Sequence, residues 1–531
     1  MIKYFKKRRK IIVFAIVVMA ITMIPYLVGY SQQGDEWRYT GFVIGVKDGN
    51  SYIAKMLAGA EGNWLFRSSH SAVEQQGFIA FLPYIILGKL TSGPAQHEQI
   101  VSLYHLARFV FGILAILATY DFISIYLKKE NLKWWALAFI TLGGGLGWLL
   151  VSLNQKEFLA SFPLEFISPE SFGFLGIFGF PHLAAARALF FWGLTLFIKR
   201  EKGYLSGILW LVTGFFQPMV VVIAWVVIGS YIAAIILAKR FDTENRLKIN
   251  ADFLGVHLRK MFQSILVSAP IVLYTAYLLL FNPYFDSWTA QNRLASPHFF
   301  HYLVAYGLVM PFTIVGIGKY IKNQKIESLL LASWLFISPF LIYAPVFAQR
   351  RWSEGIWAVY IIGMIGNYTK EGKIPVAIQG IMALLLPSTL FILVGSIMVS
   401  TNPSEPAFRP AEEVQVYDFI AKNLDKDSVF LSTFEIGNNL PAWAPIKVVM
   451  GHGPETIGLN NIETEVSAIF YERELNLEDC RRMFMELKTD YLFWGPEEKS
   501  KWKVEPEDYD CLIPIYTNGD YSVYEVDYLD K

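Results

Sequence analysis

Long apolar segments recur along the first 400 residues of this chain, and they constrain its fold more than any other feature. A helix needs about 20 mostly apolar residues to cross the hydrocarbon core of a bilayer. Only 17% of the 531 residues are charged and 54% are hydrophobic, whereas a soluble domain carries about 25% charged residues. The sequence therefore predicts a polytopic α-helical membrane protein and excludes collagen, coiled-coil and secreted disulfide-scaffold folds.

Eleven segments are predicted to span the membrane. The first follows six basic residues and is followed by no small-residue cleavage site, so it is interpreted as a retained helix and not as a signal peptide. Phe78–Leu90 is also apolar, but it has only 13 residues and contains Pro83. It is predicted to be an interfacial or re-entrant helix on the outer face. The predicted spans are Ile11–Tyr30, Ile100–Leu127, Trp134–Leu153, His182–Ile198, Tyr204–Phe216, Pro218–Ala238, Met261–Phe281, Tyr302–Gly318, Ser328–Phe347, Ser353–Gly366 and Ile374–Ser400.

Basic residues alternate between the predicted loops and indicate the orientation of the chain. Six loops hold 23 of the 34 Lys and Arg residues of the first 400 positions. Positive charge in short loops marks the cytoplasmic side of a membrane. The N-terminus is therefore predicted to be cytoplasmic, and the odd number of spans places the C-terminus outside. The predicted cytoplasmic loops are 1–10, 128–133, 199–203, 239–260, 319–325 and 367–373, and the predicted outer loops are 31–99, 154–181, 282–301 and 348–352.

Residues 401–531 differ from the rest of the chain. They contain 26 acidic and 12 basic residues, a net charge of −14, whereas residues 1–400 contain 19 acidic and 34 basic residues, a net charge of +15. The sequence thus predicts a transmembrane domain over 1–400 and a soluble extracytoplasmic α/β domain over 401–531. The elements expected in this second domain are helices at Glu412–Leu424 and Leu477–Leu487 (the latter capped by Asn476), strands at Ser428–Ser432 and Tyr491–Trp494, and a hairpin formed by Pro514–Thr517 and Tyr521–Val526 around Asn518-Gly519.

The only two cysteines, Cys480 and Cys511, lie in this acidic segment. An oxidising compartment outside the membrane allows them to pair as a disulfide. Two separately buried thiols are the alternative interpretation.

Motifs for common cofactors are absent from the sequence. The glycine-rich run Gly143–Gly147 lacks the Lys-Ser/Thr pair of a phosphate-binding loop, so close helix packing explains it better. The sequence contains no HExxH or CxxC pattern and no strand followed by GxGxxG. ATP-driven and nicotinamide-dependent chemistry therefore have no support.

Polar residues gather in the outer loops and at the outer ends of the predicted spans. Asp35 and Asp48 are each followed four residues later by a tyrosine, Tyr39 and Tyr52, and Glu170 lies in the second outer loop. An arginine inside an apolar span is costly, so it normally faces a partner or a polar cavity, although snorkelling to the interface is the alternative. The basic residues in such positions are Arg108, His182, Arg187, Arg350 and Arg351.

These features resemble the GT-C superfamily of membrane glycosyltransferases, which includes protein mannosyltransferases, aminoarabinose transferases and oligosaccharyltransferase subunits. Asp48-Gly-Asn-Ser-Tyr52 resembles the acidic motif of the first outer loop in that superfamily, with Gly49 where a second acid is often found. Asp35 is the alternative acidic residue. The resemblance implies a GT-C-like fold with a long first outer loop and a soluble domain after the last helix.

The resemblance also implies a reaction on the outer face with a polyprenyl-phosphate-linked sugar as donor and a glycan, lipid or protein as acceptor. Asp48 would be the general base and Glu170 would orient the acceptor or the base. Asn50 and Tyr52 would bind substrate, as would the five basic residues Arg108, His182, Arg187, Arg350 and Arg351. No cofactor is required, although a divalent metal is compatible with the scheme, and no nucleic acid is expected as a partner.

Two other functions remain open at this stage. A transporter or lipid flippase would place its polar groups near the membrane midplane on broken helices related by internal repeats. No repeat is detectable in the sequence, and the polar residues gather at outer helix ends. A non-catalytic membrane scaffold would leave Asp48 and the arginines of the spans without a role.

The predicted topology can be tested with single cysteines. Thr243→Cys, in the predicted cytoplasmic loop 239–260, should resist an impermeant thiol reagent in intact cells, because the reagent cannot cross the membrane. Ser404→Cys, in the predicted outer segment, should react. The reverse labelling pattern would contradict the eleven-span topology.

Overall fold

The computed structural model describes residues 6–93, 95–241, 249–323, 325–368, 372–472 and 477–528. The chain divides into two compact units. Unit 1 comprises residues 1–23, 105–277 and 293–395, and unit 2 comprises residues 24–104, 278–292 and 396–531. Unit 2 therefore combines the predicted tail with the whole of the predicted first outer loop, 31–99. Thr243 and Asn476 lie outside the described residues.

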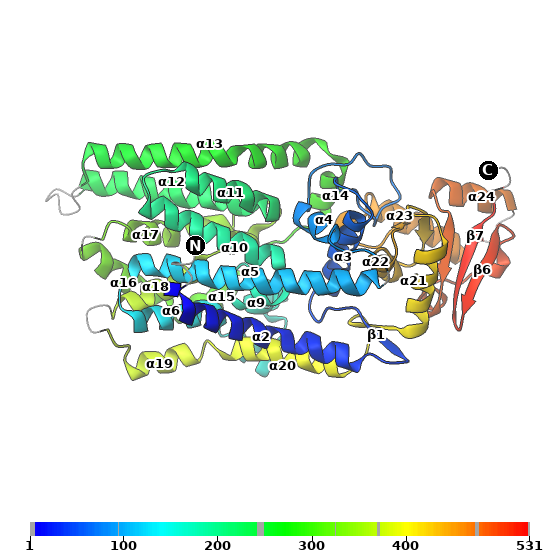
Figure 1. The fold of residues 1–531 in the computed structure, drawn as a ribbon, viewed down its shortest axis with the longest axis horizontal. Coiled ribbons are helices and arrows are strands. Elements are labelled where there is room, and N and C mark those ends of the chain that lie inside the picture. The colour runs from blue at the N-terminus through cyan, green and yellow to red at the C-terminus, as the bar shows by residue number, and fades with distance from the viewer. Residues whose placement is uncertain are drawn as a thin grey trace. The chain divides into compact units, whose positions relative to one another are not determined.

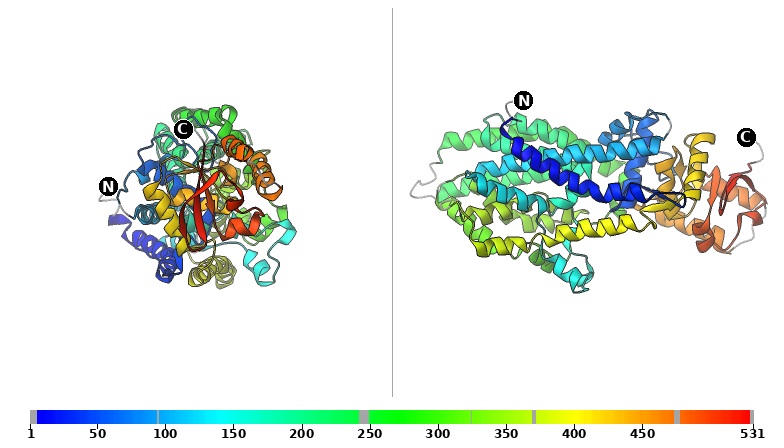
Figure 2. Two further views of the ribbon diagram at one scale, coloured as in Figure 1. Left: turned by 90° about the vertical axis from the view of Figure 1, so that its right-hand side faces the viewer. Right: turned by 60° about the horizontal axis from the view of Figure 1, so that its bottom comes forward.

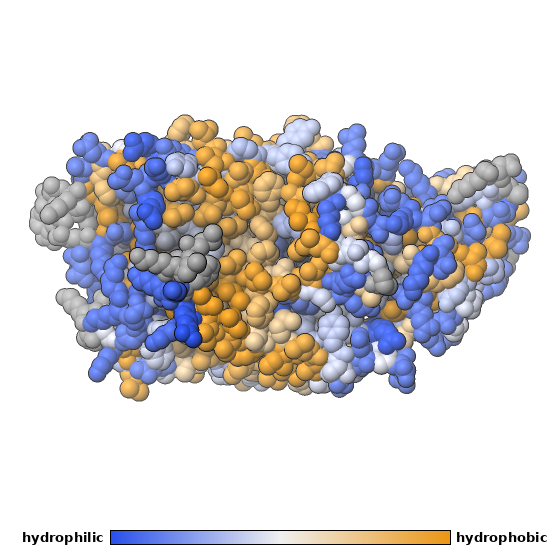
Figure 3. All heavy atoms as spheres, in the orientation of Figure 1, coloured by the Kyte–Doolittle hydropathy of each residue, from blue (hydrophilic) through white to orange (hydrophobic). Residues whose placement is uncertain are grey.

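Unit 1 is helical. Its apolar side chains form a continuous buried core, and hydrophobic residues cover a broad area of its helices on the face shown in Figure 3. Four helices have residues in both units, namely α2 (Arg9–Gln32), α5 (Gln96–Tyr126), α13 (Ala251–Phe281) and α20 (Pro387–Thr401). The other helices of unit 1 are α6 (Glu130–Leu142), α7 (Gly147–Ser152), α8 (Leu164–Ile167), α9 (Phe174–Gly179), α10 (Pro181–Lys199), α11 (Tyr204–Phe216), α12 (Pro218–Phe241), α15 (Phe299–Tyr306), α16 (Met310–Lys322), α17 (Ser328–Ile342), α18 (Ile356–Gly366) and α19 (Val376–Ala383), with 3₁₀ turns at Phe158–Ala160 and Gln349–Ser353 (Figure 1).

Six helices among the described residues are long and apolar enough to cross a membrane, or seven if the bent pair α15 and α16 counts as one span. The chain is a multi-pass membrane protein. The predicted count of eleven spans is not confirmed. At about 1.5 Å of rise per residue, α17 with 15 residues and α11 with 13 residues are shorter than a hydrocarbon core of about 30 Å. The six long spans are Arg9–Gln32, Gln96–Tyr126, Pro181–Lys199, Pro218–Phe241, Ala251–Phe281 and Val376–Thr401.

The predicted span Trp134–Leu153 is interrupted at its glycine run. Helix α6 ends at Leu142, and Gly143 has an extended backbone. A Cβ atom added to Gly144 would lie 2.8 Å from Cβ of Ser388, and one added to Gly145 would lie 2.7 Å from Cα of Ala305. Gly144 and Gly145 therefore allow a close approach of chain segments, as expected, but in the segment between α6 and α7 and not within a helix.

Unit 2 contains a five-stranded mixed sheet. Its order is β4-β3-β5-β7-β6; β4, β3 and β5 are parallel, and β7 is antiparallel to both of its neighbours, β5 and β6. The hairpin β6–β7 is drawn in red in Figure 2. All three residues of β3 are buried, which agrees with its apolar sequence. The strands are β3 (Val429–Leu431), β4 (Lys447–Val448), β5 (Tyr491–Trp494), β6 (Leu512–Asn518) and β7 (Tyr521–Val526), and the separate pair β1 (Trp37–Tyr39) and β2 (Phe408–Pro410) is antiparallel.

Both helices that the sequence predicts in the tail are present in unit 2. The hairpin also turns at Gly519, as expected, where φ is +60° and suits glycine. Helix α4 has seven residues, so it is too short to cross a membrane, as predicted for Phe78–Leu90. The helices are α3 (Val46–Ala60), α4 (Leu82–Gly88), α14 (Pro283–Gln291), α21 (Ala411–Asn423), α22 (Phe434–Trp443), α23 (Leu459–Glu472), α24 (Leu477–Glu486) and α25 (Pro496–Lys501), with 3₁₀ turns at Gly453–Glu455 and Pro506–Asp508.

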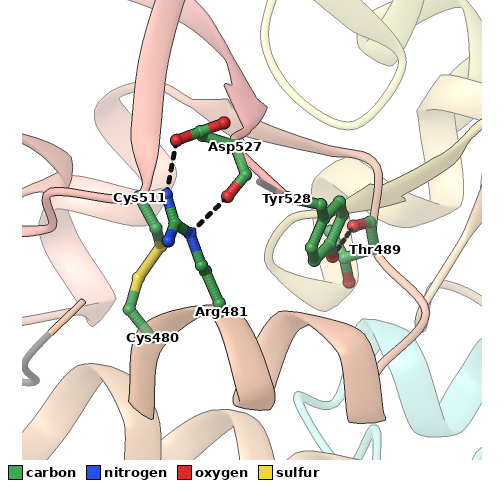
Figure 4. Close-up of a disulfide and its surroundings, with 6 residues drawn as sticks. All are labelled: Cys480, Arg481, Thr489, Cys511, Asp527 and Tyr528. Carbon is green, nitrogen blue, oxygen red and sulfur yellow. Dashed lines mark hydrogen bonds and ion pairs between the residues drawn. A yellow bond between two sulfur atoms is a disulfide. The ribbon is translucent and has the colours of Figure 1, made fainter. Parts of the chain in front are cut away.

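Cys480 on α24 and Cys511 beside β6 form a disulfide, with their Cα atoms 6.2 Å apart (Figure 4). The bond ties α24 to the sheet. Arg481, the next residue, is ion-paired at 2.6 Å with Asp527 just after β7. The paired state is therefore the correct one of the two interpretations of these cysteines.

Glu498 on α25 is fully buried beside the sheet. One carboxylate oxygen accepts hydrogen bonds from the Thr433 backbone N–H at 2.9 Å and from the Thr433 hydroxyl at 2.8 Å, whereas the other oxygen has no hydrogen-bond partner in the described part of the chain. Burial raises the pKa of Glu498 to about 8, because the charged form loses its hydration.

This burial makes unit 2 less stable as the pH rises. The unfolded chain ionises Glu498 near its ordinary pKa of 4.5, whereas the folded chain keeps its proton up to a pH of about 8. Between pH 5 and 8 the free energy of unfolding should therefore fall by about 1.4 kcal/mol per pH unit from this group. Glu498→Gln should remove that slope in denaturant unfolding of the purified protein. Parallel pH dependences of the wild type and the variant would contradict this assignment.

Candidate functional site

Asp48 lies in the first turn of α3. The helix begins after Gly45, whose left-handed backbone (φ 60°) reverses the chain, and Asp48 is the only acidic residue of its first turn. A carboxylate at a helix N-terminus is stabilised by the unpaired N–H groups there. Its side chain is 55% exposed, so it is accessible to a reacting group.

Gly49 follows Asp48, and packing explains why this position holds a glycine. A Cβ atom at this position would lie 2.6 Å from Cγ of the Phe42 ring. Phe42 is buried, and its ring is packed edge-on against Tyr104. A glutamate at position 49 would therefore require the core beneath α3 to be rebuilt.

His452 contacts Asp48 from the loop after β4. Its Nε2 lies 3.4 Å from Oδ1 of Asp48, and its Nδ1 lies 3.7 Å from Oε1 of Glu455. The imidazole is almost fully buried, with 9% of its side chain exposed. One histidine ring thus lies between an exposed carboxylate and a buried one.

Glu455 is the centre of a buried polar network. Its Oε1 accepts hydrogen bonds from Lys55 Nζ at 2.5 Å and from the Ser51 hydroxyl at 2.6 Å, and its Oε2 lies 3.5 Å from Nδ1 of His70. Burial acts to raise the pKa of Glu455, but Lys55 and the two histidines hold it well below its usual range. Glu455 is therefore ionised and paired with the Lys55 ammonium.

Asn50 and Tyr52, the predicted substrate ligands of α3, both have partners inside unit 2. The Asn50 amide donates hydrogen bonds to the side-chain oxygens of Asn438 and Asn439 on α22, at 3.0 and 2.7 Å. The Tyr52 ring is stacked on Tyr84, with 4.7 Å between the ring centroids. These contacts join α3 to α22 and α4, and a role in substrate binding stays a prediction.

In unit 1, Glu170 lies beside the predicted phosphate-binding arginines. Its Oε1 is 3.5 Å from Nε of Arg351, and the Arg351 side chain is 30% exposed, whereas that of Glu170 is 3% exposed. Arg350 and Arg351 both belong to the 3₁₀ turn Gln349–Ser353. The structure thus brings together Glu170 and Arg351.

Arg187 holds the segment around Glu170 in place. Its guanidinium is hydrogen-bonded to both carboxylate oxygens of Glu354, at 2.6 and 3.0 Å, and to the carbonyl oxygens of Pro169 and Phe172, both at 2.8 Å. Such a bidentate pair is geometrically specific. Arg187 therefore fixes the backbone on both sides of Glu170, and the predicted contact with phosphate remains untested.

Arg108 is fully buried between α2, α5 and α9. It donates to the Thr22 hydroxyl at 3.0 Å and to the carbonyl oxygen of Phe178 at 3.0 Å. His182 is half-buried at the start of α10, with its ring 6.1 Å from that of Phe180. Their roles at a phosphate stay predictions.

Five residues of these networks were not predicted from the sequence, namely Lys55, His70, His452, Glu455 and Glu354. Two features of the sequence could have indicated some of these residues. Asp48, Ser51 and Lys55 have the spacing of one helix face, and Lys55 is a single charge within an otherwise apolar helix segment. His452 lies between two glycines directly after the apolar run of β4, where a loop is expected.

Among the described residues, no group of three or more His, Cys, Asp or Glu side chains is arranged to hold a metal ion. Site residues for a divalent metal are therefore not assigned in this part of the chain.

No protein-family model matches the chain, and no curated protein matches it. Solved structures of the oligosaccharyltransferase AglB from Archaeoglobus fulgidus are similar to it. The form tethered with an acceptor peptide has a TM-score of 0.47 and 12% identity, and the similarity covers 94% of this chain and 70% of AglB. The apo form has a TM-score of 0.49 and 11% identity over 91% of this chain and 70% of AglB.

A third AglB structure, in complex with an inhibitory peptide and a dolichol-phosphate, has a TM-score of 0.46 and 11% identity over 93% of this chain and 70% of AglB. A further one contains Zn and sulfate.

The Lys55–Glu455 pair should be essential for the stability of unit 2. Lys55→Met leaves the Glu455 carboxylate buried without its cation, which typically costs about 3–5 kcal/mol. Lys55→Met combined with Glu455→Gln should recover much of this loss, because no buried charge remains. Unfolding of the purified protein in denaturant measures both effects.

Lys47→Met is the matched control. Lys47 pairs with Glu435 at 2.7 Å, but both side chains are exposed, by 50% and 38%. An exposed pair contributes about 0–1 kcal/mol. Equal losses for Lys47→Met and Lys55→Met would show that the buried network has no special role.

Proposed function

We propose that the protein is a glycosyltransferase that moves a sugar from a polyprenyl-phosphate donor to an acceptor hydroxyl on the outer face of the membrane. The observation that carries the proposal is the setting of Asp48, an exposed carboxylate at a helix N-terminus with a buried histidine and a buried ion pair behind it. Exposed acids held in this way suit general-base catalysis, which needs an accessible and oriented carboxylate.

The reaction is a single displacement at the anomeric carbon. The acceptor oxygen forms a bond to C1 of the sugar as the bond from C1 to the phosphate oxygen breaks. The electron pair of that bond stays on the phosphate, and the proton of the acceptor hydroxyl passes to the Asp48 carboxylate and then to water. One displacement predicts inversion at C1, without the second carboxylate of a retaining glycosidase.

The departing phosphate needs positive charge, since negative charge develops on its oxygen. We assign Arg351 and Arg350 to this role, because the Arg351 side chain is partly exposed and Arg187 anchors the neighbouring loop. Glu170 holds Arg351 in place. The donor must be lipid-linked because sugar nucleotides are absent outside the cytoplasm. The polyprenyl chain of the proposed donor meets this requirement.

The proposal places the N-terminus in the cytoplasm and unit 2 outside. The Cys480–Cys511 disulfide supports this orientation, because disulfides persist in oxidising compartments.

Substitution of Asp48 tests the proposal directly. Asp48→Asn keeps the size and hydrogen-bonding capacity of the side chain but removes the base. General-base catalysis contributes about 10²–10⁴-fold, so transfer of label from polyprenyl-phosphate sugars by the purified protein should fall by that order while donor binding survives.

Asp35→Asn is the control, since Asp35 is an exposed acid of the same loop just before β1. It should have a much smaller effect on transfer. If Asp35→Asn abolishes transfer and Asp48→Asn does not, the base has been misassigned. If both variants transfer sugar normally, neither Asp48 nor Asp35 is the general base, and the proposed mechanism is wrong.

A further inference from the structure

His452 is within hydrogen-bond distance of the Asp48 carboxylate but not of the Glu455 carboxylate. Its Nε2 faces Oδ1 of Asp48 at 3.4 Å, within hydrogen-bond distance, whereas its Nδ1 is 3.7 Å from Glu455 and has no hydrogen-bond partner among the residues that the structure describes. Nε2 is thus the ring nitrogen that can donate to Asp48. Glu455 does not need this donor, because Lys55 and Ser51 already donate to Glu455.

The loop that carries His452 is held rigidly. The Thr456 hydroxyl accepts hydrogen bonds from the backbone N–H groups of Gly451 and His452, at 3.2 and 3.3 Å, and donates to the carbonyl oxygen of His70 at 2.8 Å. A Cβ atom at Gly451 would lie 2.1 Å from the carbonyl oxygen of Gly437 on α22. The backbone of the loop is therefore packed directly against the helix beside α3.

The charged groups around the imidazole are few. Asp48 faces it from α3, Glu455 from its own turn, and His70 lies beside it with 5.6 Å between the ring centroids. Lys55 reaches Glu455 from α3. The buried charges of Lys55 and Glu455 compensate each other, which leaves Asp48 as the anion that the His452 donor stabilises.

We propose that His452 is a positioning residue that orients the Asp48 carboxylate for proton abstraction, with the turn that Thr456 fixes holding the imidazole in place. This inference rests on the proposed role of Asp48 as general base. A hydrogen bond to the ionised form of a carboxylate also keeps it ionised to lower pH. His452 therefore sets the direction of the base.

Two amide variants of matched chemistry test the inference. The amide of Gln reaches the position of Nε2 and can still donate to Asp48, whereas the shorter amide of Asn reaches only the position of Nδ1. In transfer assays with labelled polyprenyl-phosphate sugars, His452→Gln should keep most of kcat. His452→Asn should lose about 10- to 100-fold in kcat, with the KM for the donor little changed, because misorientation of a catalytic group by about 1 Å costs about that much.

The pH profile separates positioning from a merely structural role. The acidic limb of the pH–rate profile should move up by about one pH unit in His452→Asn and stay in place in His452→Gln, because only the latter keeps the donor on the ionised carboxylate. A loss of fold would lower the unfolding midpoint without moving this limb.

The outcomes are distinct. If His452→Asn matches the wild type in kcat and pH profile while Asp48→Asn is inactive, the positioning role is wrong and the proposed function stands. If His452→Gln and His452→Asn lose activity equally, the hydrogen bond to Asp48 is not the cause and the inference fails. If Asp48→Asn is itself fully active, the proposed function fails, and this inference fails with it.

Discussion

The buried charge of Glu455 is the interaction on which the candidate site depends. An ionised carboxylate is expensive to bury unless a cation and several donors surround it. Lys55 and Ser51 from α3 donate hydrogen bonds to Glu455, and the imidazole of His70, from the loop after α3, lies 3.5 Å from its second oxygen. Because these residues are up to about 400 positions apart in the chain, satisfying one carboxylate also fixes α3, and with it Asp48, against the C-terminal segment of unit 2.

The arginines of unit 1 follow the same physical rule in a more apolar setting. Arg187 is bound to Glu354 and to backbone carbonyls, and Arg108 is bound to a hydroxyl and to carbonyls. An arginine in an apolar environment needs such partners. Both side chains thus hold the loops and helices around them in place, whereas Arg351, which is partly exposed, has more freedom to meet a ligand.

Much of the fold could be predicted from periodicity and composition. The six long spans, the two helices of the tail, the hairpin at Asn518-Gly519 and the short helix near Pro83 all have local signals of the required length. Shorter apolar segments misled the count of spans, because hydropathy does not show where a helix breaks, as at Gly143. The first outer loop and the tail form one unit through contacts between distant residues such as Arg38 and Arg409, which no local pattern encodes.

The site could be predicted only in part for the same reason. Asp48 and Glu170 stand in recognisable short motifs, but the partner of each is remote in the sequence. His452 is 404 positions from Asp48, and Arg351 is 181 positions from Glu170.

The most direct measurement of the central claim uses a polyprenyl-phosphate sugar with separate labels on lipid and sugar. The donor is incubated with the purified protein in vesicles, and a membrane extract serves as acceptor. The account predicts that the sugar label leaves the lipid and that the lipid is recovered as polyprenyl phosphate. Recovery of the intact donor in the opposite leaflet, with both labels still joined, would contradict it and show a flippase.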